Sequence, residues 1–140
     1  MAKQKIILDS SVIVKFLFSE GEEYLRQADQ LLHETREGAI DLLAPVLSKY
    51  EVGNVIRFRN MTITEKQVNW DNFGLVPIKF IEMQEKDGRR ALDIAEMFKI
   101  TFYDAIFLAL AERMKAILVT ANPKHQKKLA GVKVVDLKDY

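Results

Sequence analysis

The chain has 140 residues, the length of one domain, and we expect residues 1–140 to form a single domain. Apolar residues make up 49% of the sequence, which excludes a disordered chain. With 21 basic and 20 acidic side chains, the net charge of +1 neither supports nor excludes a nucleic-acid partner. The absence of cysteine excludes disulfides, thiolate metal sites and a cysteine nucleophile.

The basic start of the chain is followed by a short apolar run at residues 6–8. Three apolar residues are far too few for the core of a signal peptide or for a membrane span. We therefore expect a soluble, cytoplasmic protein with no membrane association.

Short apolar runs alternate with segments of helical periodicity in the first half of the chain. Strands are predicted at 6–8 and 42–44, the second ended by Pro45. Helices are predicted at 10–18, after a capping box of Ser19 and Glu22 as far as Gly38, and at 46–58, where the apolar members are Leu47, Tyr50, Val55 and Phe58.

The second half continues the alternation. Further strands are predicted at 75–78, where Pro77 favours an edge position, at 117–120 and at 132–135. Helices are predicted after a Thr64–Gln67 cap, at 82–97, from Thr101 to Met114, and as a short basic helix after Asn122-Pro123. This order predicts an α/β fold with three α/β/α layers around a central, mostly parallel sheet. Sites in such sheets form at the carboxyl ends of the strands.

Acidic and amide side chains fall where this fold places its site. Asp9 directly follows the first strand, Glu51 lies early in the helix after the second, and Asn122 follows the 117–120 strand. Asp104 lies in the first turn of its helix and joins them if that end points to the same sheet edge. Mg²⁺ and Mn²⁺ prefer carboxylate and water oxygens. Such an ion activates water, polarises a phosphoryl oxygen and orients an in-line attack.

Each of these residues also has a purely structural explanation. Asp9 suits the N-cap of the next helix, and Asn122 before Pro123 suits an N-cap followed by proline. Thr101 and Asp104 match the first-turn pattern of a capped helix. Glu51 taken alone is most often a solvated helix residue. The joint placement of the acids, together with their flanking residues, favours a metal site.

Four segments carry a resemblance to a known family. Residues 7–12, 50–55, 101–111 and 118–122 read ILDSSV, YEVGNV, TFYDAIFLALA and LVTAN. In order and spacing, from Ile6 to Val135, they resemble a PIN domain of the VapC toxin-like branch. The segment around Asp104 is the most specific of the four.

The resemblance implies a metal-dependent nuclease in which Asp9, Glu51 and Asp104 coordinate Mg²⁺ or Mn²⁺. The family usually has aspartate at a fourth position, where this chain has Asn122. An amide offers a carbonyl oxygen but removes a negative charge, which favours one-metal chemistry or reduced activity. Small hydroxyl side chains at Ser11 and Thr120 match family positions and could orient a carboxylate or bond locally.

The resemblance further implies a divalent-metal-dependent endoribonuclease that hydrolyses RNA phosphodiester bonds as the toxin of a toxin–antitoxin pair. It implies a cognate antitoxin protein and a homodimer as partners. Two alternatives stay open: a catalytically weakened module that binds RNA or protein, and a housekeeping RNA-processing nuclease.

Other chemistry has little support. The chain lacks phosphate-loop and GxGxxG motifs, and its two histidines form no HxxxH pair. His33 is expected at the surface, which leaves a Ser-His-Asp triad unsupported. A basic cluster near Asn122 could guide RNA phosphates or form a solvated face: Lys124, His125, Lys127 and Lys128. Further basic candidates for RNA contacts are Arg57, Arg59, Arg89 and Arg90. Tyr103 could border the cleft. Trp70 and Phe73 are expected in the core or on a dimer face.

Overall fold

One parallel sheet organises the computed structural model, which describes residues 3–125 and 129–140. Its strand order is β3-β2-β1-β4-β5, and all four pairings are parallel. The strands are β1 (Gln4–Leu8), β2 (Ile40–Pro45), β3 (Ile78–Ile81), β4 (Ile117–Thr120) and β5 (Val134–Asp136).

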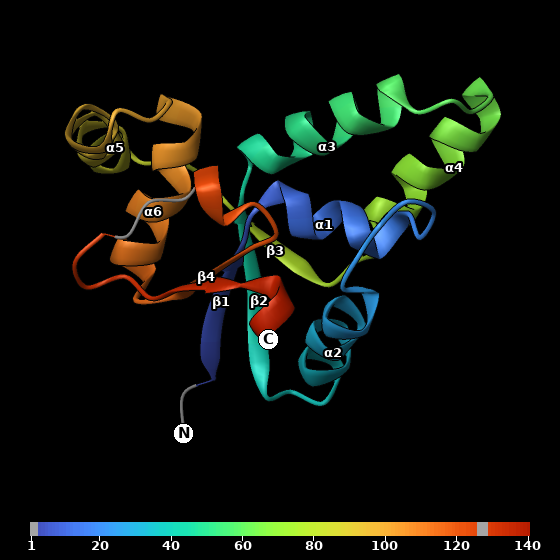
Figure 1. The fold of residues 1–140 in the computed structure, drawn as a ribbon, viewed down its shortest axis with the longest axis horizontal. Coiled ribbons are helices and arrows are strands. Elements are labelled where there is room, and N and C mark those ends of the chain that lie inside the picture. The colour runs from blue at the N-terminus through green and yellow to red at the C-terminus, as the bar shows by residue number, and fades with distance from the viewer. Residues whose placement is uncertain (1–2, 126–128) are drawn as a thin grey trace.

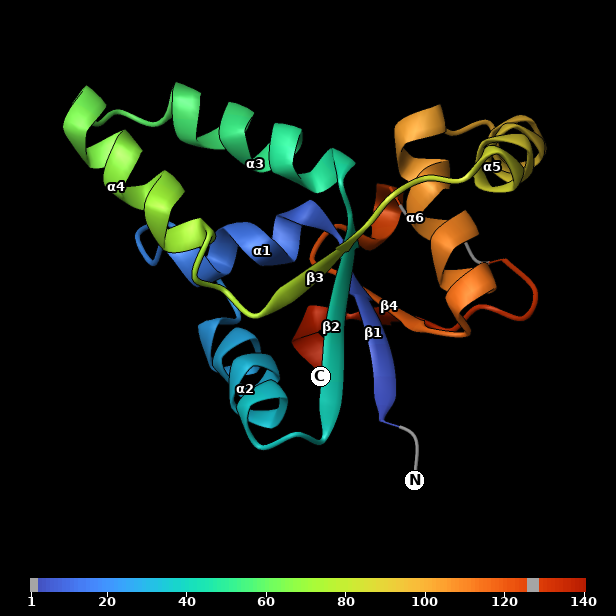
Figure 2. The same cartoon turned by 180° about the vertical axis from the view of Figure 1, so that it is seen from behind.

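Helices cover both faces of this sheet. They are α1 (Ser10–Leu17), α2 (Leu25–Arg36), α3 (Leu47–Phe58), α4 (Ile63–Phe73), α5 (Glu85–Phe98) and α6 (Phe102–Met114), with 3₁₀ turns at Pro123–His125 and Leu137–Asp139. Figures 1 and 2 show α5 and α6 on one face and α1 and α2 on the other, with α3 and α4 as a hairpin beyond α1. The predicted three-layer α/β/α fold is confirmed. Within the described residues, no helix is both long and apolar enough to cross a membrane.

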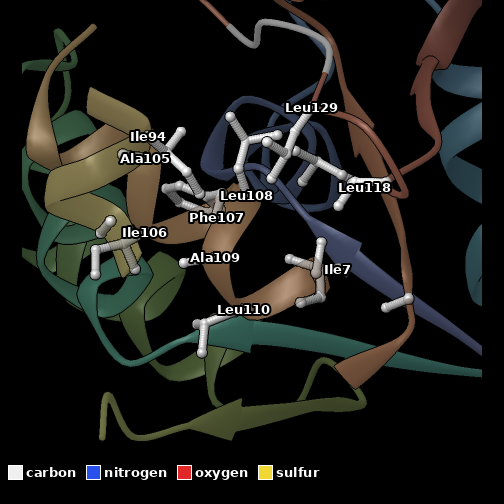
Figure 3. Packing of buried hydrophobic residues seen from close by; sticks show 14 of the residues in the cluster. Ile7, Ile94, Ala105, Ile106, Phe107, Leu108, Ala109, Leu110, Leu118 and Leu129 are labelled. Carbon is white, nitrogen blue, oxygen red and sulfur yellow. The ribbon is translucent and has the colours of Figure 1, made fainter. Parts of the chain in front are cut away.

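The alternation of side chains along β1 separates two cores. Ile7 points to the α5–α6 side, whereas Ile6 and Leu8 point to the α1–α2 side. Helix α6 is buried through seven consecutive residues, 105–111, because it lies between the sheet and α5 (Figure 3). This central helix explains why the sequence around Asp104 is so continuously apolar.

The carboxyl ends of the central strands meet at one edge of the sheet. Asp9 follows β1, and its backbone N–H donates to the carbonyl of Val119 on β4 at 2.9 Å. Helix α3 starts two residues after Pro45, the end of β2. The chain thus brings the residues after β1, β2 and β4 to a single place.

Several predicted boundaries are wrong. Ser19 and Glu22 cap no helix: α2 begins at Leu25, and the Glu22 carboxylate pairs with Lys15 and Arg59 instead. The capping box of α4 is Thr62 with Glu65, two residues earlier than predicted. The same pattern of a hydroxyl residue followed by an acid or amide occurs by chance, and only the path of the chain decides which pair opens a helix.

Two strands and one helix face are also shifted. The strand predicted at 75–78 is β3 (Ile78–Ile81), an edge strand as expected, and the last strand begins at Val134. In α3 the buried residues are Ser48, Val52 and Ile56. The side chains of Tyr50 and Phe58, predicted as apolar members, are each 74% exposed because α3 packs through its other face.

Candidate functional site

All four candidate site residues line one cavity of about 400 Å³, which we name the acid cavity. It lies at the carboxyl edge of the sheet, beside the ends of β1 and β4, the second and third turns of α3 and the first turn of α6. Its lining comprises Asp9, Ser10, Ser11, Val14, Glu51, Asn54, Val55, Asp104 and Asn122. Residues separated by more than 110 positions therefore share a single space.

Asp9 holds the N-cap position of α1 through its backbone, since its carbonyl accepts from the N–H of Val12 at 2.9 Å. Its side chain makes no cap hydrogen bond. The carboxylate instead accepts a 2.7 Å hydrogen bond from Oγ1 of the fully buried Thr120. That hydroxyl oxygen also accepts from the backbone N–H of Asn122 at 3.0 Å. Thr120 thereby fixes a carboxylate, one of the two roles considered for it.

Glu51 is held by a buried serine. Ser10 Oγ donates to Glu51 Oε1 at 2.8 Å and lies 3.1 Å from Oγ of Ser48, which is fully buried. Partial burial raises the pKa of the Glu51 carboxyl above its ordinary value, and the hydrogen bond from Ser10 opposes this. The negative charges of Asp9 and Asp104 raise the pKa further. The three carboxylates are thus electrostatically coupled.

Asp104 lies in the first turn of α6, and its N–H donates to the side chain of Thr101 at 3.1 Å. The capped helix start predicted from Thr101 and Asp104 is therefore confirmed, and it coexists with the position of the carboxyl group at the acid cavity. Asn122 is exposed and directly precedes the 3₁₀ turn Pro123–His125. Ser11 Oγ accepts a 3.1 Å hydrogen bond from the backbone N–H of Ala121, and this bond connects α1 to the segment after β4.

The acid cavity offers the oxygen donors that a hard cation prefers: three carboxylates and one amide. Burial is the main cause of the raised pKa of Glu51, and the charges of Asp9 and Asp104 add a smaller repulsion, which a cation would relieve. As placed in the described residues, however, no three His, Cys, Asp or Glu side chains are close enough to hold a metal ion. The chemistry of the donor set therefore fits Mg²⁺ or Mn²⁺, while shared coordination requires the carboxylates to lie closer together than they do here.

The coupling predicts the effect of removing one charge. In chelator at pH 7, Glu51→Gln should raise the thermal midpoint, because a partly buried carboxylate beside two others destabilises the fold. The folded-state pKa lies above the unfolded value of about 4.3, so this cost exists above the folded pKa and disappears as pH falls below about 4. Thermal denaturation of both proteins across pH 3–8 checks this. Parallel curves for the two proteins would contradict it.

Sequence reasoning missed the two buried serines. Ser10 directly follows Asp9, and Ser48 precedes Glu51 by three residues, on the same face of α3. That spacing was the available signal. Tyr103 is not among the residues that line the acid cavity, and it lines a separate apolar cavity together with Tyr50. Phe73 is buried as expected, whereas Trp70 is 46% exposed.

The basic cluster after Asn122 is only partly within view. Lys124 is exposed, and Lys127 and Lys128 lie outside the described residues. His33 is exposed, as expected.

Known structures share this fold. VapBC2 from Rickettsia felis, bound to a DNA fragment from its promoter, aligns with a TM-score of 0.72 and 15% identity over 95% of this chain and 98% of the other. A toxin–antitoxin complex from Klebsiella pneumoniae aligns with a TM-score of 0.65 and 20% identity over 94% of this chain and 97% of the other. VapC20 from Mycobacterium tuberculosis, described as a sarcin-ricin loop cleaving toxin, aligns with a TM-score of 0.64 and 10% identity over 90% of this chain and 92% of the other. At such low identities, it is the TM-scores that establish a common fold.

Comparison with curated protein sequences finds no match. A family model described as PIN domain, in contrast, matches residues 6–132, nearly the whole chain. The matched region contains Asp9, Glu51, Asp104 and Asn122. The three-layer fold and its carboxyl-edge cavity agree with this match. The chain belongs to the PIN domain family.

Proposed function

We propose that this protein is a divalent-metal-dependent endoribonuclease that hydrolyses RNA phosphodiester bonds. The observation that carries the proposal is the meeting of Asp9, Glu51 and Asp104 at one cavity, with coupled charges. Membership of the PIN domain family and a fold shared with VapC20 support it.

The residues of the acid cavity divide the work between holding and positioning. Asp9, Glu51 and Asp104 would hold Mg²⁺ or Mn²⁺, with the Asn122 carbonyl oxygen as a weaker fourth donor. The bound ion would supply Lewis-acid polarisation of the phosphate and a water of lowered pKa. Thr120 orients the carboxylate of Asp9, and Ser10 orients that of Glu51. Because these acids position the ion, none of them is needed as a nucleophile.

The decisive experiment is RNA cleavage by the purified protein with Mg²⁺ or Mn²⁺, repeated with excess chelator. We expect cleavage that stops when the metal is removed. Cleavage that survives in chelator would overturn metal dependence, and the absence of cleavage under every metal condition would overturn the nuclease.

A partner protein is the second part of the proposal. Structural neighbours include VapBC and toxin–antitoxin complexes, which supports a toxin role with an antitoxin partner. Homodimer formation is a further part of the proposal. The α3–α4 hairpin offers exposed large apolar side chains for such contacts: Tyr50, Val55, Phe58, Ile63, Val68 and Trp70. A toxin of this kind would act on RNA in the cytoplasm. A small antitoxin gene beside this one would separate the toxin from a housekeeping RNA-processing nuclease.

Asn122 favours one alternative, a module that kept the fold and lost turnover. It lines the acid cavity at the position where an additional carboxylate would strengthen cation binding. If turnover is weakened for this reason, Asn122→Asp should raise cleavage about tenfold or more, within the range for tuning a metal site. Single-turnover cleavage at saturating Mg²⁺ measures this. Robust activity of the parent protein, unchanged by the substitution, would exclude the weakened module.

A further inference from the structure

A second cavity, of about 530 Å³, lies against the acid cavity and shares four lining residues with it, Ser11, Val14, Val55 and Asn122. We name it the cation cavity, because its remaining wall contains two basic side chains. The residues that line this cavity alone are Lys15, Gly21, Glu22, Glu23, Tyr24, Arg59 and Ala121.

Two cations in this wall converge on one carboxylate. Lys15 Nζ on α1 lies 3.1 Å from Glu22 Oε1, and a terminal nitrogen of Arg59, at the end of α3, lies 3.3 Å from Glu22 Oε2. The side chain of Lys15 is only 8% exposed, and that of Arg59 is 27% exposed. Glu22 therefore marks a position at which an oxyanion is held from two sides.

Aromatic rings restrict both cations. The guanidinium carbon of Arg59 lies 4.1 Å from the ring centre of Phe18, and Lys15 Nζ lies 5.9 Å from that of Tyr24. Tyr24 is 38% exposed, and its backbone has a φ of 61°, which is rare for a residue other than glycine. Fixed cations beside an accessible ring suit a nucleotide, whose phosphate and base need the two groups separately.

The two cavities differ in charge. Among the described residues, the acid cavity is lined by three carboxylates and by no lysine or arginine. An RNA strand crossing it carries a phosphate at every nucleotide, and those phosphates need cationic partners of their own. The adjoining cavity provides two cations, Lys15 and Arg59, beside the carboxylates of Glu22 and Glu23.

We propose that Lys15 and Arg59 bind an RNA phosphate that flanks the scissile one, and that Glu22 occupies this oxyanion position until the RNA backbone displaces it. The proposal rests on the proposed action of the acid cavity on RNA. In this assignment Tyr24 stacks on the neighbouring base. Glu22 is then a built-in competitor of the substrate.

Equilibrium binding of a fluorescent, uncleavable 2′-O-methyl RNA in chelator tests this without requiring catalysis. Glu22→Gln should bind about tenfold more tightly, because the competing charge is gone. Its matched control is Glu37→Gln, which makes the same charge change at an exposed residue outside both cavities and should stay within about threefold of the parent. Arg59→Gln and Lys15→Met should each bind about tenfold more weakly.

The salt dependence of RNA binding distinguishes a direct phosphate contact from a purely structural role of Lys15 and Arg59. Each lost phosphate contact should lower the slope of log K against log salt by about 0.7, whereas the matched control Arg57→Gln, an exposed residue outside both cavities, should leave the slope unchanged. Equal slopes for Arg59→Gln and Arg57→Gln, with no gain for Glu22→Gln, would overturn the proposal and assign the cations to bracing the 18–24 loop or to an acidic peptide. If Glu22→Gln fails to fold, the Arg59 and Arg57 pair decides.

Binding and cleavage fail independently in this design. An altered salt slope without metal-dependent cleavage would keep the phosphate site and refute the nuclease. Metal-dependent cleavage with unaltered slopes would do the reverse.

Discussion

Asp104→Asn should lose about a hundredfold or more of the RNA cleavage rate in Mg²⁺. Removing groups that merely orient metal ligands costs about 10–100-fold, so losing a direct ligand should cost at least the upper end of that range. Asparagine keeps the shape of the side chain, and the backbone N–H of residue 104 still donates to Thr101. The substitution should therefore spare the fold and remove the charge. Initial cleavage rates at several Mg²⁺ concentrations measure the loss.

The matched control for this substitution is Asp29→Asn on α2, which removes the same charge from an exposed position away from the acid cavity. It should cleave like the parent protein. Thermal midpoints of both variants should stay near that of the parent. Cleavage by Asp104→Asn at the rate of the control would mean that the reaction does not use the acid cavity.

Among the substitutions considered, Asp87→Ala should cause the largest loss in the free energy of unfolding. The side chain of Asp87 on α5 is 2% exposed, and its Oδ1 accepts a 2.7 Å hydrogen bond from Nε of Arg113 on α6. It also accepts from the backbone N–H of Gln84, which closes the capping box of α5. Breaking a buried ion pair from one side costs about 3–5 kcal/mol, and the partial exposure of Arg113 argues for the lower end. At about 2–4 °C per kcal/mol, the thermal midpoint should fall by about 6–12 °C.

Asp93→Ala on the same helix serves as the control, because Asp93 is exposed. Its free energy of unfolding, measured in urea, should change by less than about 0.5 kcal/mol. The effect of Asp87→Ala should also shrink in an Arg113→Met background, where no partner cation is left unpaired. A small loss in the single variant would mean that the pair contributes little to the packing of α5 on α6.

Strong local signals explain which elements could be predicted. The run Ile117–Thr120 is rich in β-branched and apolar residues, and it forms β4 with the predicted bounds. Thr101 opens α6 as predicted, because the apolar run behind it leaves no other start for the helix. Where the signal was weak, as at Ser19 with Glu22 and Thr64 with Gln67, the predicted caps were wrong. Glu22 is drawn instead to two cations distant in the sequence.

The sequence by itself determined the layered α/β fold, the parallel sheet and the order in which the acids arrive at its carboxyl edge, because alternation and periodicity are local properties of the chain. The tertiary structure alone decided which hydroxyls hold which carboxylates: Thr120 meets Asp9 across 111 residues, and Ser10 meets Glu51 across 41. It also decided that Lys15 and Arg59 share the carboxylate of Glu22. Contacts of this kind depend on how helices pack around the sheet, and no spacing within one segment encodes them.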